Sequence, residues 1–211
     1  MQIRIRKLPL RLLIAIVTFG IGILVTMLWV VPRVPVKEQT IQLEIPDAPW
    51  QPAFFELLEE RTKTVNLPSL RAVALPARDL EVRFWYDRFE IINGLVIRRT
   101  GQQWSAYWIY QAEDHLPSSS QMVTLHSPKS GWDNLWKNLL EIGILTLPDS
   151  ARAQCRTEAL DGIGYIVETS VNRKYRTYRY GNPQLMKCSE AKQMIELEKT
   201  IADEFRLPWG I

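Results

Sequence analysis

Histidine and cysteine are scarce in this chain, and the short motifs of the common catalytic sites are missing. Of its 211 residues only two are histidine, His115 and His126, and only two are cysteine, Cys155 and Cys188. The sequence has no Gly-x-Ser-x-Gly elbow, no phosphate-binding glycine loop, no His-Glu-x-x-His helix and no Cys-x-x-Cys pair. These absences exclude a histidine-rich metal centre, so the sequence predicts no metal or cofactor and favours a non-enzymatic role.

Isolated carboxylates keep one enzymatic alternative open. Asp149, Asp161 and Glu168 lie near the ends of predicted strands, and glycoside hydrolysis needs two carboxyl groups about 5–10 Å apart in a cleft. Turn formation is the better explanation for Asp149 and Asp161, and the polar face of a strand explains Glu168. The acidic and histidine-bearing run at residues 113–115 is interpreted as a solvated loop, because adjacent residues rarely point at one ion.

Acidic residues are absent from the first 31 positions, where a long apolar run follows a basic start. Residues 1–11 carry four Lys or Arg side chains, and the twenty residues from Leu12 to Val31 carry no charge. A helix rises about 1.5 Å per residue, so this run is long enough to cross a bilayer. The sequence therefore predicts a transmembrane anchor over residues 12–31. A cleaved signal peptide is the alternative, but bulky residues followed by Pro32 and Pro35 make a poor cleavage site.

The distribution of positive charge predicts which side of the membrane each part occupies. Four basic residues precede the anchor and only Arg33 and Lys37 follow it closely. This asymmetry favours a cytoplasmic N-terminus and an exported C-terminal part, periplasmic in a bacterium with two membranes. Beyond residue 31 the chain has 22 basic and 23 acidic residues. A part so nearly neutral lacks the basic face that nucleic-acid binding needs, so nucleic acid is excluded as a partner.

Prolines and hydrophobic periodicity divide the remainder into a tether and one domain. Residues 32–52 contain five prolines and little periodicity, which predicts a semi-extended tether. Residues 53–211 are enough for one domain with a single core. Alternating apolar residues predict about five strands, and helical spacing predicts a short helix over 53–61 and two main helices over 130–143 and 189–206. This order predicts an α+β fold with an antiparallel sheet and both main helices packed on one face.

The two cysteines are predicted to form a disulfide bond. An exported domain lies in an oxidising compartment, where an even pair of cysteines is often bonded. The segment between Cys155 and Cys188 has the pattern of a β-hairpin, which brings its two ends together. Closing this loop would stabilise the fold by about 4 kcal/mol on the chain-entropy model. Two buried free thiols are the alternative.

Tryptophan is abundant, with 8 in the chain, and three of the indoles point to a glycan-binding alternative. Trp85, Trp104 and Trp108 lie on neighbouring predicted strands. An exposed platform of such rings binds sugars by stacking, and in the envelope the sugar would belong to a polysaccharide. Packing of the same rings in the core is the competing interpretation. The two hypotheses differ in whether the indoles are exposed or buried.

A strand that interleaves cations with tyrosines is the predicted contact surface. Its members are Arg173, Lys174, Tyr175, Arg176, Tyr178, Arg179 and Tyr180. Such a surface suits an anionic lipid headgroup, an acidic polymer or the acidic face of another envelope protein. A solvated strand whose cations pair with cross-strand acids is the alternative.

Five short segments carry a resemblance to known sequences. They are "RTGQQWSAYWI" at residues 99–109, "GILTLPD" at 143–149, "DGIGYIVE" at 161–168, "YRTYRYGNP" at 175–183 and "EAKQM" at 190–194. The chain resembles, over roughly residues 81–205, a recurrent group of bacterial exported proteins without an assigned activity, and the resemblance implies one envelope domain and no particular chemistry. The sequence as a whole predicts a membrane-anchored, non-enzymatic binding module of the cell envelope. A glycan-binding or glycan-hydrolysing domain is the alternative.

Overall fold

The computed structural model describes the C-terminal part of the chain. The described residues are 41–47, 50–88, 91–111, 120–153, 155 and 162–207. The predicted anchor at residues 12–31 lies outside them, as do the run at 113–115 and Asp161. Within the described part, no helix combines the length and the apolar character that crossing a membrane requires.

A mixed sheet forms the centre of the domain. In chain order its strands are β1 (Gln42–Glu44), β2 (Leu80–Arg88), β3 (Ile91–Thr100), β4 (Gln103–Gln111), β5 (Ser120–Thr124), β6 (Gly164–Val171) and β7 (Lys174–Gly181). The described residues form a 7-stranded sheet in the order β1-β7-β6-β2-β3-β4-β5. All neighbouring strands are antiparallel except β1 and β7, which are parallel. The α+β class is therefore confirmed, but the sheet is larger than the predicted five strands and is mixed.

The parallel edge strand, β1, lies in a segment that was predicted to be part of the tether. β1 lies within residues 32–52 and pairs with β7 over only three residues, from Gln42 to Glu44. Three residues are too few to show a period of two in the sequence. The Glu44 carboxylate holds this edge in place by ion pairs with Lys174 Nζ at 2.6 Å and Arg176 Nε at 2.9 Å. The folded domain thus begins before the predicted boundary at residue 53.

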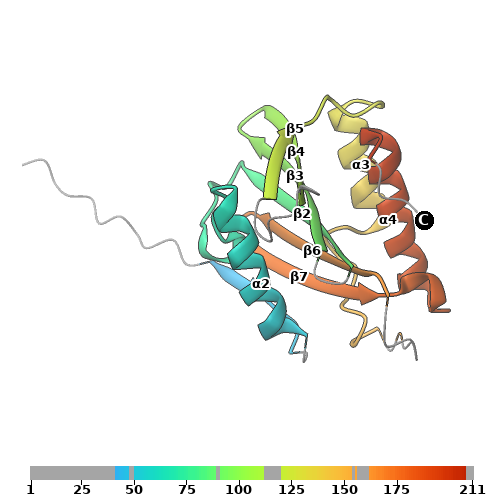
Figure 1. The fold of residues 1–211 in the computed structure, drawn as a ribbon. Coiled ribbons are helices and arrows are strands. Elements are labelled where there is room, and N and C mark those ends of the chain that lie inside the picture. The colour runs from blue at the N-terminus through green and yellow to red at the C-terminus, as the bar shows by residue number, and fades with distance from the viewer. Residues whose placement is uncertain are drawn as a thin grey trace, which may run out of the picture. The chain divides into compact units, whose positions relative to one another are not determined.

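The helices cover both faces of the sheet (Figure 1). They are α2 (Gln51–Thr64), α3 (Trp132–Ile142) and α4 (Ser189–Phe205), with single 3-10 turns at η1 (Leu70–Ala72) and η2 (Pro183–Leu185). The two longer amphipathic stripes of the sequence, in α3 and α4, pack together on one face. The first helix, α2, is longer than the predicted span of 53–61, with 14 residues, and packs on the opposite face. We refer below to these as the α3/α4 face and the α2 face.

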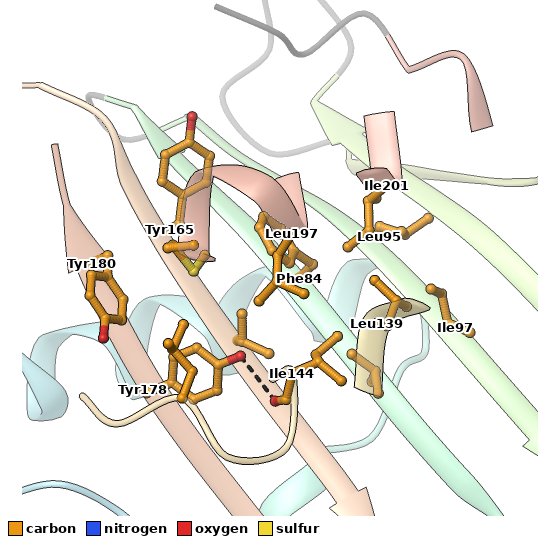
Figure 2. Close-up of a cluster of buried hydrophobic side chains, with 14 of the residues drawn as sticks. Phe84, Leu95, Ile97, Leu139, Ile144, Tyr165, Tyr178, Tyr180, Leu197 and Ile201 are labelled. Atoms are coloured by element: carbon orange, nitrogen blue, oxygen red, sulfur yellow. Dashed lines mark hydrogen bonds between the residues drawn. The ribbon is translucent and has the colours of Figure 1, made fainter. Parts of the chain in front are cut away.

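The α3/α4 face is filled by apolar and aromatic side chains. Figure 2 shows Leu197 of α4 beside Phe84 of β2, with Leu139 of α3 in the same cluster, and all three are fully buried. The hydroxyl of Tyr178 donates to the backbone carbonyl of Ile144 at 3.0 Å, which gives the one polar atom of that ring a partner. The apolar stripes of α3 and α4 therefore meet apolar and aromatic side chains of the sheet in this half of the core.

A disulfide bond joins Cys155 to Cys188 at the margin of this core, as predicted, with the two Cα atoms 5.8 Å apart. Cys188 is the residue immediately before α4, and Cys155 lies in the segment that connects α3 to β6. The bond therefore ties this connection to the start of the C-terminal helix. A covalent link across a long connection limits the conformations of the unfolded chain and stabilises the fold.

Candidate functional site

A cavity of ≈ 410 Å³ lies on the α2 face of the sheet, under the connection between α2 and β2. The connection folds back over the sheet and places Leu67 and Leu70 in the core of this face. Val73 and Leu75, which follow, complete an apolar wall. Tyr107 of β4 and the exposed Met122 of β5 line the cavity from the sheet side. A volume of this size is in the ordinary range for a small-ligand pocket.

Charged side chains of β2 and β3 also line this cavity. Glu81 and Arg98 are cross-strand partners, and Arg83 follows two positions after Glu81 on the same face of β2. Arg83 Nε donates to Glu81 Oε1 at 2.7 Å, and Arg98 Nε donates to Glu81 Oε2 at 2.7 Å. The single carboxylate therefore bridges two guanidinium groups. Side chains with alternating orientation along paired strands bring these three together.

Arg83 is the unusual member of this cluster, because it is a buried cation that is not fully paired. Its side chain is 1% exposed, and its Nη2 donates to the backbone carbonyl of Pro68 at 2.8 Å. Its Nη1 is buried with no hydrogen-bond partner among the residues that the structure describes. Burying a charged donor without a partner is costly. Such a residue beside a cavity is a reason to look for a ligand.

A second buried carboxylate lies on the other side of Arg83. Glu168 of β6 is the cross-strand partner of Arg83, and it accepts hydrogen bonds from Trp85 Nε1 at 2.7 Å and from the Tyr175 hydroxyl at 2.8 Å. Burial raises the pKa of Glu168, and the nearby guanidinium of Arg83 only partly opposes this. Glu168 is therefore held by Trp85 and Tyr175, while the hydrogen bonds of Arg83 go to Glu81 and Pro68.

The three tryptophans of the predicted platform do not share a surface. Trp85 is fully buried on the α2 face, where its ring lies against Gly94; a Cβ atom at position 94 would lie 2.4 Å from that ring. Trp104 and Trp108 belong to the α3/α4 face. Trp104 is stacked on Trp132 of α3, with ring centroids 5.6 Å apart. The exposed platform required by the glycan-binding hypothesis is therefore not formed by these residues.

The predicted contact strand is β7, which lies inside the sheet between β1 and β6. Its rings Tyr175, Tyr178 and Tyr180 are 0% exposed, because both faces of the sheet are covered. Arg176 is also buried, bound to Glu44 and to the backbone carbonyl of Leu147, and Arg179 is half-buried. Of the predicted surface, Arg173 and Lys174 are exposed, at the turn and the first position of the strand. The strand as a whole does not present the interleaved surface that the sequence suggested.

The carboxylates considered for glycan hydrolysis have other hydrogen-bond roles. Asp149 accepts from the backbone N–H groups of Ala151 at 3.0 Å and Arg179 at 2.9 Å, as a turn-forming aspartate does. Glu168 is held by Trp85 and Tyr175 as described above. Neither Asp149 nor Glu168 lines the cavity.

Sequence reasoning missed Glu81, Arg83 and Arg98, because charged residues that alternate with apolar ones usually lie on a solvated face. One signal was available. Trp85 lies on the same face of β2 as Glu81 and Arg83, since side chains alternate along a strand. A large indole on a charged strand face indicates that another part of the protein covers that face.

The arrangement as a whole combines two guanidinium groups with an apolar wall around one cavity. Pockets of this kind, mostly apolar with a few polar groups that fix orientation, bind small molecules or the ends of chains. In comparisons with known proteins, no family model, no curated protein and no solved structure matches this chain. Its function is therefore argued from the geometry of the cavity.

Proposed function

We propose that this chain is a binding module of the cell envelope, held at the membrane by residues 12–31, which binds its ligand in the cavity on the α2 face. The observation that carries the binding role is Arg83. It lines the cavity, it is 1% exposed, and its Nη1 has no partner in the described part of the domain. A fold tolerates such a group where a ligand supplies the missing interaction.

Export of the domain is the second part of the proposal. The basic N-terminus and the uncharged run that follows it favour this orientation. The disulfide between Cys155 and Cys188 is consistent with it, because such bonds persist mainly in oxidising compartments.

Binding is tested with the full chain purified in detergent, labelled with 13C at its methionine methyl groups. Met122 lines the cavity and is 41% exposed, whereas Met194 is fully buried in α4 on the other face and serves as the internal control. The probes are three sets of small aromatic compounds: acids, amines and neutral amides. At least one set is expected to shift the Met122 resonance and leave Met194 unchanged. The binding role is overturned if no compound shifts Met122 up to millimolar concentration.

Export is tested with alkaline phosphatase fused after Ile211, because this enzyme is active only when it is exported. An active fusion is expected. A fusion that is expressed but inactive would place the domain in the cytoplasm and remove the envelope from the proposal, whatever the binding experiment shows.

A further inference from the structure

We infer that the ligand of this cavity is a monocarboxylate with an apolar body, either a small organic acid or the C-terminal residue of a peptide, bound through Arg98 and Arg83. This inference rests on the proposed binding function and names the chemical class of the ligand.

The charge of the cavity favours a single negative charge on the ligand. Two guanidinium groups face one carboxylate, that of Glu81, so the cluster carries an unbalanced positive charge. The other carboxyl group near Arg83, Glu168, is fully buried, burial raises its pKa, and it accepts hydrogen bonds from Trp85 and Tyr175 rather than from Arg83. One added carboxylate balances the cluster. An amine would add a third cation, and a phosphate dianion would leave one charge unmatched beside Glu81.

The hydrogen-bond geometry identifies Arg98 as the residue that contacts the ligand. Both oxygens of Glu81 are already engaged, one by each arginine. Arg98 reaches Glu81 through Nε, which leaves its two terminal nitrogens outside this ion pair, and its side chain is 34% exposed. A guanidinium group whose terminal nitrogens lie outside its ion pair suits the planar geometry of a carboxylate. Arg83, buried beneath, contributes its charge and its Nη1, which has no hydrogen-bond partner among the described residues.

The walls of the cavity require an apolar body on the acid. The connection after α2 contributes aliphatic side chains, and Tyr107 and Met122 lie on the sheet side. A flexible methionine at the mouth of a pocket adapts to ligands of different shape. The ring of Tyr107 lies 5.9 Å from the guanidinium carbon of Arg98, which orients the cation beside an aromatic surface. The volume of ≈ 410 Å³ holds a body of several carbon atoms as well as the carboxylate.

The test is a titration of the full chain in detergent, followed by the Met122 methyl resonance. The probes are 3-phenylpropionate, the matched amide and the matched amine, which share one apolar body and differ in charge. The acid is expected to bind at least tenfold more tightly than the amide or the amine. N-acetyl-Ala-Phe with a free carboxyl end and the same dipeptide with an amide end form the second arm. Tighter binding of 3-phenylpropionate than of the free dipeptide identifies a small acid as the source, and the reverse identifies a peptide C-terminus.

Substitutions at neighbouring positions of β3 provide the matched control. Arg98→Gln is expected to weaken binding of the acid at least tenfold, and Arg98→Lys to restore part of it, since lysine keeps the charge but loses the planar fork. Arg99→Gln removes the same charge from the next residue, whose side chain reaches Arg78 and Trp104 instead, and is expected to leave binding unchanged. Thermal unfolding of each variant verifies that it is folded.

The outcomes separate this inference from the proposed function. If the amine or amide shifts Met122 as strongly as the acid does, or if folded Arg98→Gln binds the acid as the unchanged chain does, the carboxylate inference is overturned and the binding module stands. If nothing shifts Met122, both are overturned.

Discussion

The two faces of the sheet are covered in different ways. On the α3/α4 face, two amphipathic helices, a buried apolar cluster and a disulfide bond close the core. On the α2 face, one helix and a folded-back connection cover a smaller apolar cluster, and beside it lie a bridged pair of arginines and a cavity. One sheet thus supports both a densely packed core and a charged pocket. If the cavity binds a ligand as proposed above, stability and binding belong to opposite faces of the same strands, and each prediction below tests that division.

The largest effect is expected from removing the disulfide bond. The bond closes a connection 33 residues long in sequence, and replacing Cys155 and Cys188 together by Ala should lower the free energy of unfolding by about 4 kcal/mol on the chain-entropy model. The measurement is urea unfolding of the full chain in detergent. Reductant should lower the stability of the unchanged chain to the level of the variant and leave the variant itself unaffected. Equal stability of the variant and the unchanged chain in the absence of reductant would contradict this prediction.

The next effect compares a leucine from each face. Leu139→Ala, on the α3/α4 face, should lower the free energy of unfolding by about 3 kcal/mol, because the packed neighbours relax little around the lost volume. Leu70→Ala, at the edge of the cavity, should have a smaller effect of about 2 kcal/mol. Leu140→Ala is the control, since this side chain is 43% exposed and should change stability by under about 1 kcal/mol. A larger loss of stability for Leu70→Ala than for Leu139→Ala would contradict the expectation that the α3/α4 face is the more tightly packed one.

On the α2 face, Glu81→Gln should lower the free energy of unfolding by as much as Leu139→Ala does on the α3/α4 face. It leaves Arg83 and Arg98 without their shared carboxylate, and removing one partner of a buried ion pair typically costs about 3 kcal/mol or more. Urea unfolding measures the loss. The control is Glu141→Gln on α3, where the carboxylate is 64% exposed in its pair with Lys137 and the expected loss is under about 1 kcal/mol. Similar losses for the two variants would mean that burial adds nothing to the central cluster.

The smallest effect, a dependence on pH, is expected from Glu168→Gln. Burial raises the pKa of Glu168, so the folded state holds a proton that the unfolded chain releases above its ordinary pKa of 4.5. The contribution of this carboxyl group to stability is complete below pH 4.5 and declines as the pH rises toward the folded pKa. Glutamine retains an oxygen for Trp85 and does not titrate, so the variant should gain stability relative to the unchanged chain between pH 4 and pH 8.

Unfolding at pH 4, 6 and 8 gives this difference directly. Glu44 and Glu198 titrate with shifted pKa values in both proteins and cancel in the comparison. A difference that shrinks as the pH rises would show that Glu168 is stabilised as the anion, and the charge balance of the cavity would then have to be revised.

The sequence predicted the α3/α4 face far better than the α2 face, for physical reasons. Periodicity located α3 and α4 to within a few residues, because an apolar stripe on a long helix reports burial directly. The tight turns at Gly101 and at Asn172–Arg173 have positive φ angles, which glycine and asparagine adopt more readily than most residues. The disulfide followed from the hairpin between its cysteines.

The cavity was hidden because its parts have no periodic signal. The connection after α2 has the composition of a loop, and only the folded chain shows that Leu67 and Leu70 cover β2. In the sequence, Glu81 and Arg83 alternate with Val82 and Phe84, a pattern that is typical of a strand with one face toward solvent. The contact surface on β7 was misplaced because helices cover both faces of the sheet, which buries the tyrosines on either side of that strand.

The attachment of β1 has a mechanical consequence. A protein pulled by its N-terminal end transmits the load first to the element nearest that end, which in the described domain is β1. This strand is held by a three-residue parallel ladder and by the ion pairs of Glu44, whereas the next strands in the sheet are longer and buried on both sides. Tension along the chain therefore detaches β1 before it deforms the cavity. Loss of this short strand would release the load while the cavity keeps its shape.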